Sequence, residues 1–170
     1  VPNRLTADGV STSEITAILL DTTGGLFTPV SEGTPIRFSL RGLGTLSSTI
    51  AYTSGGNASV TLTAGIRVDT LVVIAIGPIL PSGDTLMDSV EVILVPGEPH
   101  RVEFITSMLH DLPANCVDTE LVAVRVLDAK GNLVGAGYDV TFSTTKGAIT
   151  TTSATNDTGY AFAVYTASCT

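Results

Sequence analysis

The chain has 170 residues, of which 44% are hydrophobic and only 14% are charged. The hydrophobic content is sufficient for a folded core and argues against disorder, while the charged fraction is well below the roughly 25% of ordinary soluble domains. The net charge is −8 with only eight Lys and Arg, so the chain lacks the basic surface that binding to nucleic acid or anionic lipid requires.

Short segments with alternating apolar and polar residues follow one another through the first half of the chain. Such alternation is typical of strands with one buried face, and it predicts strands at residues 14–20, 36–41 and 58–64. Residues 68–76 are nearly all β-branched or apolar, which predicts a central strand buried on both faces, and residues 90–95 form the next strand. Turn signals separate these segments at Asp21–Gly25, Ser54–Asn57 and Pro78–Gly83.

The second half begins at a proline-rich segment, Pro96, Gly97, Glu98 and Pro99. Prolines restrict the backbone, so we expect a short, semi-rigid linker between a first domain at residues 1–95 and a second at 100–170. Alternating segments at 102–106, 122–126 and 160–167 predict the strands of the second domain. No stretch has a convincing helical period, so the fold class is all-β.

One stretch of the sequence occurs twice, from Leu5 to Leu26 and from Leu112 to Leu133, with eight identical positions. The correspondence continues where Ile36–Ser39 matches Val140–Ser143 and where Gly56 matches Gly159. The period of 107 residues is the size of one small β-sandwich. The duplication therefore predicts two tandem sandwiches.

The pattern LTADG-x-STS-x-ITA-x-LLD, followed by Gly-Gly, a Pro-x-x-Phe-Ser strand and GNASVTLTA, resembles the group 1 bacterial immunoglobulin-like domains. The resemblance extends over nearly the whole chain and departs in the second copy, where Cys116 replaces the usual Gly. Such domains form the rod-like stalks of invasin- and intimin-type surface adhesins. The resemblance implies two immunoglobulin-like sandwiches that act mostly as spacers, with ligand binding in another domain.

The two copies do not contain the same set of strands. The second copy has no segment equivalent to Val68–Val95, and the first copy has no segment equivalent to Val102–Thr106. The sequence starts at Val1, so we expect a processed mature form or an excised piece. The missing strands then have two explanations: the chain is part of a longer array, or another chain completes its sheets. The longest apolar run, Leu71–Leu80, is too short to span a bilayer, so we expect no membrane insertion in this segment.

The two cysteines, Cys116 and Cys169, are expected to form a disulfide, which suits an exported protein. Two free buried thiols are the alternative. The disulfide would close a loop of more than 50 residues and stabilise the fold by roughly 4 kcal/mol through the lost chain entropy of the unfolded state.

Catalytic, cofactor and metal sites are not expected. His110 and Asp111 could form a dyad or half of a metal site, but no second cluster of ligands has suitable spacing, so we interpret them as loop residues. Glu98, Asp8 and Asp111 could supply oxygen ligands to calcium near the linker, although scattered acids on a solvated surface explain them better.

Asn57 and Asn156 each begin an Asn-x-Ser/Thr pattern that fits N-glycosylation. Both lie at predicted turns. When the two copies are aligned, their positions differ by one place. Shared turn chemistry therefore explains them about as well as modification does.

Three functions remain open from the sequence. The first is a non-catalytic stalk of a bacterial cell-surface adhesin, whose partners are other domains or subunits of a surface structure and, through other domains, a host or cell-surface ligand. The second is a subunit of an extracellular filament or pilus whose chains complete each other's sheets by strand addition. The third, a glycan-binding module, is disfavoured because the chain has no Trp and few aromatic residues.

Overall fold

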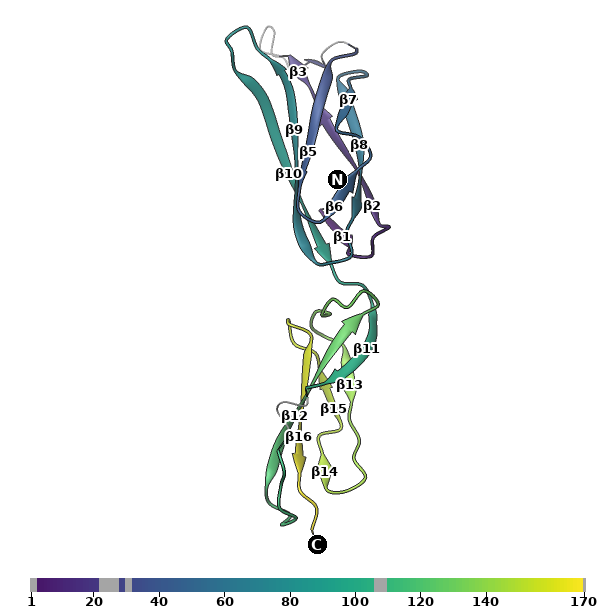
Figure 1. Cartoon of the computed structure of the whole chain (residues 1–170), viewed down its shortest axis with the longest axis vertical. Helices are drawn as coiled ribbons and strands as arrows, with labels where there is room; N and C mark the ends of the chain where they lie inside the picture. Colours follow the sequence, from purple (N-terminus) through teal and green to yellow (C-terminus); the bar gives the residue numbers. More distant parts are fainter. Residues whose placement is uncertain (1–2, 22–27, 30–31, 106–109, 170) are drawn as a thin grey trace. The chain divides into compact units, whose positions relative to one another are not determined.

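A computed structural model describes residues 3–21, 28–29, 32–105 and 110–169. Their regular structure consists of strands, which confirms the all-β prediction. Contacts divide the chain into two compact parts, unit 1 (Val1–Val95) and unit 2 (Pro96–Thr170), and each is a β-sandwich (Figure 1). Across these described ranges, no helix is long and apolar enough to cross a membrane.

Unit 1 consists of a five-stranded sheet, a three-stranded sheet and a short two-stranded pair. The larger sheet contains, in spatial order, β1 (Arg4–Thr6), β10 (Thr85–Val95), β9 (Asp69–Ile79), β5 (Pro35–Arg41) and β7 (Ile50–Tyr52). The smaller sheet contains β2 (Thr12–Ile18), β8 (Asn57–Ala64) and β6 (Gly44–Leu46). The pair is formed by β3 (Leu20–Asp21) and β4 (Thr28–Pro29).

The core of unit 1 lies between its two sheets and follows the predicted alternation. Along β8 the inward side chains are almost completely buried, and their exposed fractions are at most 4% (Ala58, Val60, Leu62 and Ala64). From the larger sheet, Phe38 of β5 and Leu71 and Val73 of β9 meet them in the same cluster. Burying side chains of this size stabilises the fold by roughly 1.5–3 kcal/mol each.

The prediction that residues 68–76 are buried on both faces is wrong. Leu71 and Val73 are buried, but Val72, Ile74 and Ile76 on the opposite face are only half-buried, because the smaller sheet covers one face of β9. The strand is also longer than predicted and continues past Pro78 to Ile79. Its pairing with β5 ends at Ile76, so the missing N–H of Pro78 removes no bond to β5.

Unit 2 has a four-stranded sheet and a two-stranded sheet. The four-stranded sheet contains β11 (Pro99–Phe104), β12 (Thr119–Asp128), β16 (Tyr160–Thr166) and β14 (Ala148–Ile149). The second sheet pairs β13 (Asp139–Thr141) with β15 (Thr152–Ala154). The core cluster draws on both sheets and contains Val124, Val126, Val134, Val140, Phe142, Ala161 and Ala163.

The duplication in the sequence is repeated in the backbone hydrogen bonds. The Leu19 N–H donates to the Gly56 carbonyl in unit 1, and the equivalent Val126 N–H donates to the Gly159 carbonyl in unit 2. The two bonds are 2.8 and 2.9 Å long. The pairings β2–β8, β6–β8 and β5–β7 recur as β12–β16, β14–β16 and β13–β15. The two units are therefore copies of one sandwich.

The units differ in the strands that flank this shared set. Unit 1 contains the β9–β10 hairpin and β1, while among the described residues of unit 2 no strand pairs with β13 other than β15. Unit 2 instead contains β11, paired antiparallel with β12. In unit 1 the equivalent strand, β2, is an edge strand of its described sheet.

Candidate functional site

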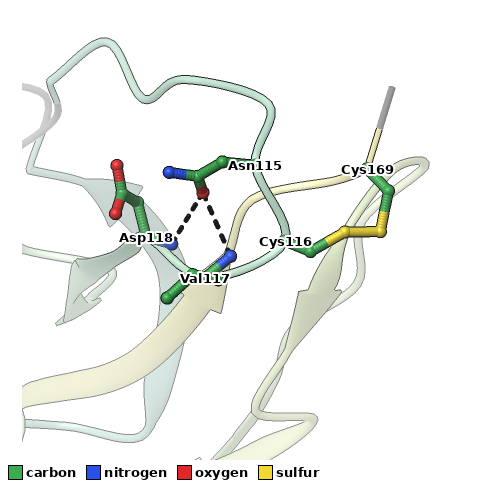
Figure 2. The surroundings of a disulfide bond; sticks show 5 residues. All are labelled: Asn115, Cys116, Val117, Asp118 and Cys169. Atoms are coloured by element: carbon green, nitrogen blue, oxygen red, sulfur yellow. Dashed lines mark hydrogen bonds between the residues drawn. A yellow bond between two sulfur atoms is a disulfide. The ribbon is translucent and has the colours of Figure 1, made fainter.

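The disulfide joins Cys116 to Cys169 in unit 2, with 4.8 Å between the two Cα atoms (Figure 2). Cys116 follows Asn115, whose side-chain Oδ1 accepts hydrogen bonds from the N–H groups of Val117 and Asp118 at 3.0 and 2.9 Å. Asn115 and Cys169 also form an isolated antiparallel bridge. Both cysteines are exposed, so the alternative of two free buried thiols is wrong.

Cys116 has a φ of +63° and is the one non-glycine residue with positive φ among the residues described. L-residues adopt this left-handed conformation at a cost of roughly 1–2 kcal/mol. The disulfide and the Asn115 turn hold Cys116 there. The disulfide therefore fixes the turn ahead of β12 to the segment that follows β16.

The equivalent turn in unit 1 is built around Asp8 and Gly9. The Asp8 carboxylate accepts hydrogen bonds from the Ser11 and Val10 N–H groups at 2.7 and 2.8 Å, and from the Ser11 hydroxyl at 2.7 Å. These hydrogen bonds favour the ionised carboxylate and lower the pKa of Asp8 to about 2. Asp8, considered from the sequence as a calcium ligand, instead organises its own turn.

A buried carboxylate, Asp128, lies at the end of β12 and is 2% exposed. It accepts hydrogen bonds from the N–H groups of Gly97, Lys130 and Asn132 and from the Asn132 side chain, at 2.8–2.9 Å. Burial acts to raise the pKa of Asp128, but the hydrogen bonds from Asn132, Gly97 and Lys130 outweigh it and the pKa is lowered. This network attaches the start of unit 2 to its own sandwich.

The sequence analysis did not identify the role of Asp128. The Asp-x-x-Gly-Asn pattern of residues 128–132 was the available signal, because Asp commonly bonds to backbone N–H groups in such turns. The matching turn of unit 1 includes residues 22–25, which lie outside the described residues. The contact with Gly97 depends on tertiary structure and has no sequence signal.

The four proposed linker residues all belong to unit 2 by their contacts. Gly97 binds Asp128, and Pro99 is the first residue of β11. Beyond Pro99, Glu103 bridges Arg101 and Arg125 through contacts of 2.7–2.8 Å. The hydrogen bond from Arg125, followed by the charges of both guanidinium groups, holds the pKa of Glu103 below its usual value.

His110 is largely exposed and lies 3.0 Å from Glu120, between Nδ1 and Oε1. The side chain that His110 contacts is therefore Glu120, and Asp111, with which a dyad was considered and set aside in favour of loop residues, is exposed. In the part of the chain that the structure describes, no three His, Cys, Asp or Glu side chains are grouped so as to hold a metal ion.

The two Asn-x-Ser/Thr patterns lie at exposed turns. Asn57 closes a turn in which Ser54 and Asn57 exchange backbone hydrogen bonds, and Gly55 and Gly56 both have positive φ. The Asn156 Oδ1 accepts hydrogen bonds from the Thr158 N–H, the Thr158 hydroxyl and the Tyr160 N–H at 2.8–3.0 Å. Both asparagines thus take part in turns, and their glycosylation stays a prediction.

The structure of this chain is similar to several solved structures. No family model matches the sequence, and no curated protein matches it. The structure of Yersinia pseudotuberculosis InvD matches with a TM-score of 0.59 at 19% identity, over 98% of this chain and 47% of InvD. The D0–D1 domain of intimin matches at 25% identity with a TM-score of 0.46, over 99% of this chain and 82% of that one.

The Y. pseudotuberculosis adhesin InvE matches at 20% identity with a TM-score of 0.47, over 96% of this chain and 49% of InvE. The match to InvD shows that the two structures share the immunoglobulin-like fold. The predicted resemblance to invasin- and intimin-type domains is thereby confirmed at the level of the fold, as two tandem immunoglobulin-like sandwiches. The chain spans about half the length of the InvD and InvE structures.

Each immunoglobulin-like unit has an apolar groove between its sheets. In unit 1, a groove of about 520 Å³ lies between residues 15–20, along β2, and residues 86–90 of β10. In unit 2, a groove of about 490 Å³ is lined by β11, β12 and β13. Val102 and Phe104 of β11 face this second groove and remain 52% and 63% exposed. Each groove lies beside an edge strand of its described sheet.

Proposed function

We propose that this chain is a non-catalytic stalk segment of a bacterial cell-surface adhesin. The observation that carries this proposal is the duplicated immunoglobulin-like sandwich, whose fold matches the InvD structure. Its location is extracellular, on the bacterial surface, and its partners are other domains or subunits of the same surface structure. A host ligand would be bound by another domain.

Three features support a mechanical role. Each unit has its own buried core. The Asp128 network fixes the first residues of unit 2 to its sandwich through Gly97. The disulfide joins two cysteines that are 53 positions apart in unit 2 and so closes a covalent loop. A pulling force can extend only the residues outside this loop.

Single-molecule force spectroscopy of the chain tests this role. A stalk gives two unfolding events, one per unit, and no saturable binding of the chain to host cells. Reduction of the disulfide lengthens the unfolding step of unit 2 by about 180 Å, the extended length of a 53-residue loop. A single featureless extension at low force would contradict the stalk role. Saturable binding of the correctly folded chain to host cells would contradict it as well.

The second candidate is a subunit of an extracellular filament that grows by strand addition. Among the described residues, β2 in unit 1 and β13 in unit 2 each have one edge that no other strand pairs with. Such edges favour a filament subunit, because they are templates for pairing with another chain. Electron microscopy of the purified chain distinguishes the two functions: regular fibres indicate a filament subunit, and separate particles indicate a stalk segment.

A further inference from the structure

The outer face of the five-stranded sheet of unit 1, which is the face turned away from the core, is built from rows of side chains that cross β5, β9 and β10. Residues directly opposite one another in an antiparallel pair lie on the same face of the sheet, so the register of β9 with its two neighbours defines each row. The rows are Arg41–Val72–Glu91, Ser39–Ile74–Ser89 and Arg37–Ile76–Met87. An apolar stripe therefore runs along β9, between the side chains of β5 and those of β10.

This apolar stripe is accessible to solvent. Val72, Ile74 and Ile76 are half-buried, because their neighbours in the rows shield them and the smaller sheet covers the opposite face. Met87, at the end of one row, is 70% exposed, and Tyr52 of β7, on the same face, is 66% exposed. A continuous apolar stripe with a polar rim is typical of an interaction surface.

The row through Val72 carries opposite charges that do not meet within one chain. β9 lies between Arg41 and Glu91, so their Cα atoms are about 10 Å apart at the usual strand spacing. Neither side chain forms an ion pair within the described part of the chain. In unit 2, by contrast, Arg125 and Glu103 lie on adjacent strands and pair directly at 2.7 Å. Unit 1 thus has a positive and a negative side chain on opposite sides of its apolar stripe.

This arrangement is complementary to itself. Consider two copies packed face to face, with a two-fold axis between them that runs parallel to β9 and passes over Ile74. The axis exchanges the β5 side with the β10 side, so Arg41 of each copy lies over Glu91 of the other, and Ser39 lies over Ser89. An isologous interface requires this reciprocity. Sheets packed face to face are about 10 Å apart, with their strands within roughly 30° of each other, and Arg and Glu side chains can span this distance.

We propose that the outer face formed by β5, β9 and β10 is a docking surface for a second copy of this chain. Val72, Ile74 and Ile76 form the apolar centre of the interface, and two reciprocal ion pairs between Arg41 and Glu91 flank it. An acidic ligand fits this face less well, because Glu91 lies at the same level as Arg41 and would repel it. Such a dimer is independent of the stalk role.

The size of the outer face predicts a weak dimer. Outward side chains recur about every 6.6 Å along a strand, and strands are about 4.8 Å apart. The outward side chains of the five strands would therefore bury roughly 500 Å² per copy, which is less than the 800 Å² per partner of a standard interface. We expect a dissociation constant in the micromolar range or above.

Sedimentation equilibrium of the chain tests the proposal, at concentrations up to about 1 mM because the interface is small. Arg41→Glu and Glu91→Arg should each weaken the dimer by at least about tenfold, since each places like charges at two contacts. The double variant restores both ion pairs with the net charge unchanged, so its dissociation constant should return to within about threefold of the native value. Arg67→Glu is the matched control: Arg67 is exposed and lies outside the rows, and its substitution changes the net charge as Arg41→Glu does but should leave the dimer unaffected.

A monomer at every concentration, or a dimer that both single variants leave intact, would overturn the proposal. Equal unfolding midpoints of the native protein and the single variants show that the variants are folded. If the chain stays monomeric and its outer face binds polyglutamate, the occupant is an anionic ligand and the proposal is wrong.

A cross-linking measurement is less dependent on the strength of the dimer. Under mild oxidation, a mixture of Ser39→Cys protein and Ser89→Cys protein should form disulfide-linked dimers at least about tenfold faster than either protein alone. The reason is that the axis brings position 39 of one copy over position 89 of the other, while the two copies of position 39 stay on opposite sides of the stripe. Equal rates in the mixture and in the separate proteins would exclude this mode of docking.

Discussion

The turn at Asp8–Gly9 in unit 1 and the turn at Asn115–Cys116 in unit 2 occupy equivalent positions and have the same hydrogen-bonding plan. In each, an Asp or Asn side chain accepts the N–H groups of the residues two and three positions later. In each, the next residue has positive φ, +83° at Gly9 and +63° at Cys116. The chemistry that maintains the turn differs between the units.

Unit 1 uses a carboxylate and a glycine, so its turn depends on ionisation and carries little backbone strain. Unit 2 uses a neutral amide and a cysteine, so its turn is independent of ionisation, and a disulfide compensates for the strained backbone. The same backbone conformation is therefore supported by an ionised carboxylate in unit 1, and by a neutral amide together with a disulfide in unit 2.

The largest expected effect comes from removing that covalent bond. Cys169→Ala should lower the free energy of unfolding of unit 2 by about 4 kcal/mol, through the chain entropy that the unfolded state regains. Hydrogen exchange at the Val126 amide measures this loss, and the equivalent Leu19 amide in unit 1 is the internal control. Equal changes at the two amides would contradict a disulfide that acts on unit 2 alone.

The next effect is expected at the carboxylate of unit 1. Asp8→Ala removes the acceptor of three hydrogen bonds and should destabilise unit 1 by about 2 kcal/mol, measured by urea unfolding. Asp8→Asn is the matched control, because it reproduces the Asn115 turn of unit 2 and should lose less than half as much. If the two variants are equally destabilised, the hydrogen bonds of the turn are not the source of the effect.

A smaller effect is expected from exchanging the residues at positive φ. Gly9→Ala should cost unit 1 about 1 kcal/mol, because an added Cβ is strained at this φ and would lie 3.0 Å from the Ile66 side chain. Conversely, in the Cys169→Ala background, Cys116→Gly should recover about 1 kcal/mol of the stability of unit 2. Thermal unfolding of the four proteins measures both changes, and a loss on Cys116→Gly would show that strain at Cys116 is negligible.

The smallest effect is the dependence on pH. An aspartate whose folded pKa is below its unfolded value contributes stability above the unfolded pKa and loses it as the pH falls toward the folded one. Asp8 has an ordinary pKa of 3.8 and a folded pKa of about 2, so its contribution should be complete above about pH 4 and lost near pH 2. Asp8→Asn should flatten the stability of unit 1 across this interval, and Asn115→Asp should introduce a similar slope in unit 2. Identical acid unfolding curves for the native protein and Asp8→Asn would contradict this account.

The period-two pattern predicted much of the fold because it depends on which face of a strand is buried. Ala58, Val60, Leu62 and Ala64 alternate in the sequence and are all buried along β8. The same pattern failed for β9, where a nearly continuous apolar run predicted burial on both faces. A run of this kind indicates that a strand is central but not how many layers cover it, and in unit 1 a sheet covers only one face.

The functional features were less accessible from the sequence. Asp8 and Asp128 were visible as acids near turns, but only their surroundings show that backbone N–H groups already occupy their oxygens. His110 was considered with its neighbour Asp111, whereas its partner is Glu120, ten positions away. His110 lies in the segment between β11 and β12, and its contact with Glu120 depends on how that segment folds back onto β12, which short-range spacing does not predict.

The sequence by itself determined that one sandwich was duplicated, where most of its strands lie and which two cysteines join, because repeats, alternation and cysteine count are local or compositional. Only the tertiary structure decided which strand edges lack partners and where apolar grooves lie beside them. Those properties arise from which strands become neighbours. β5 and β9, for example, pair within one sheet although β6 and β8, which lie between them in the sequence, belong to the other sheet.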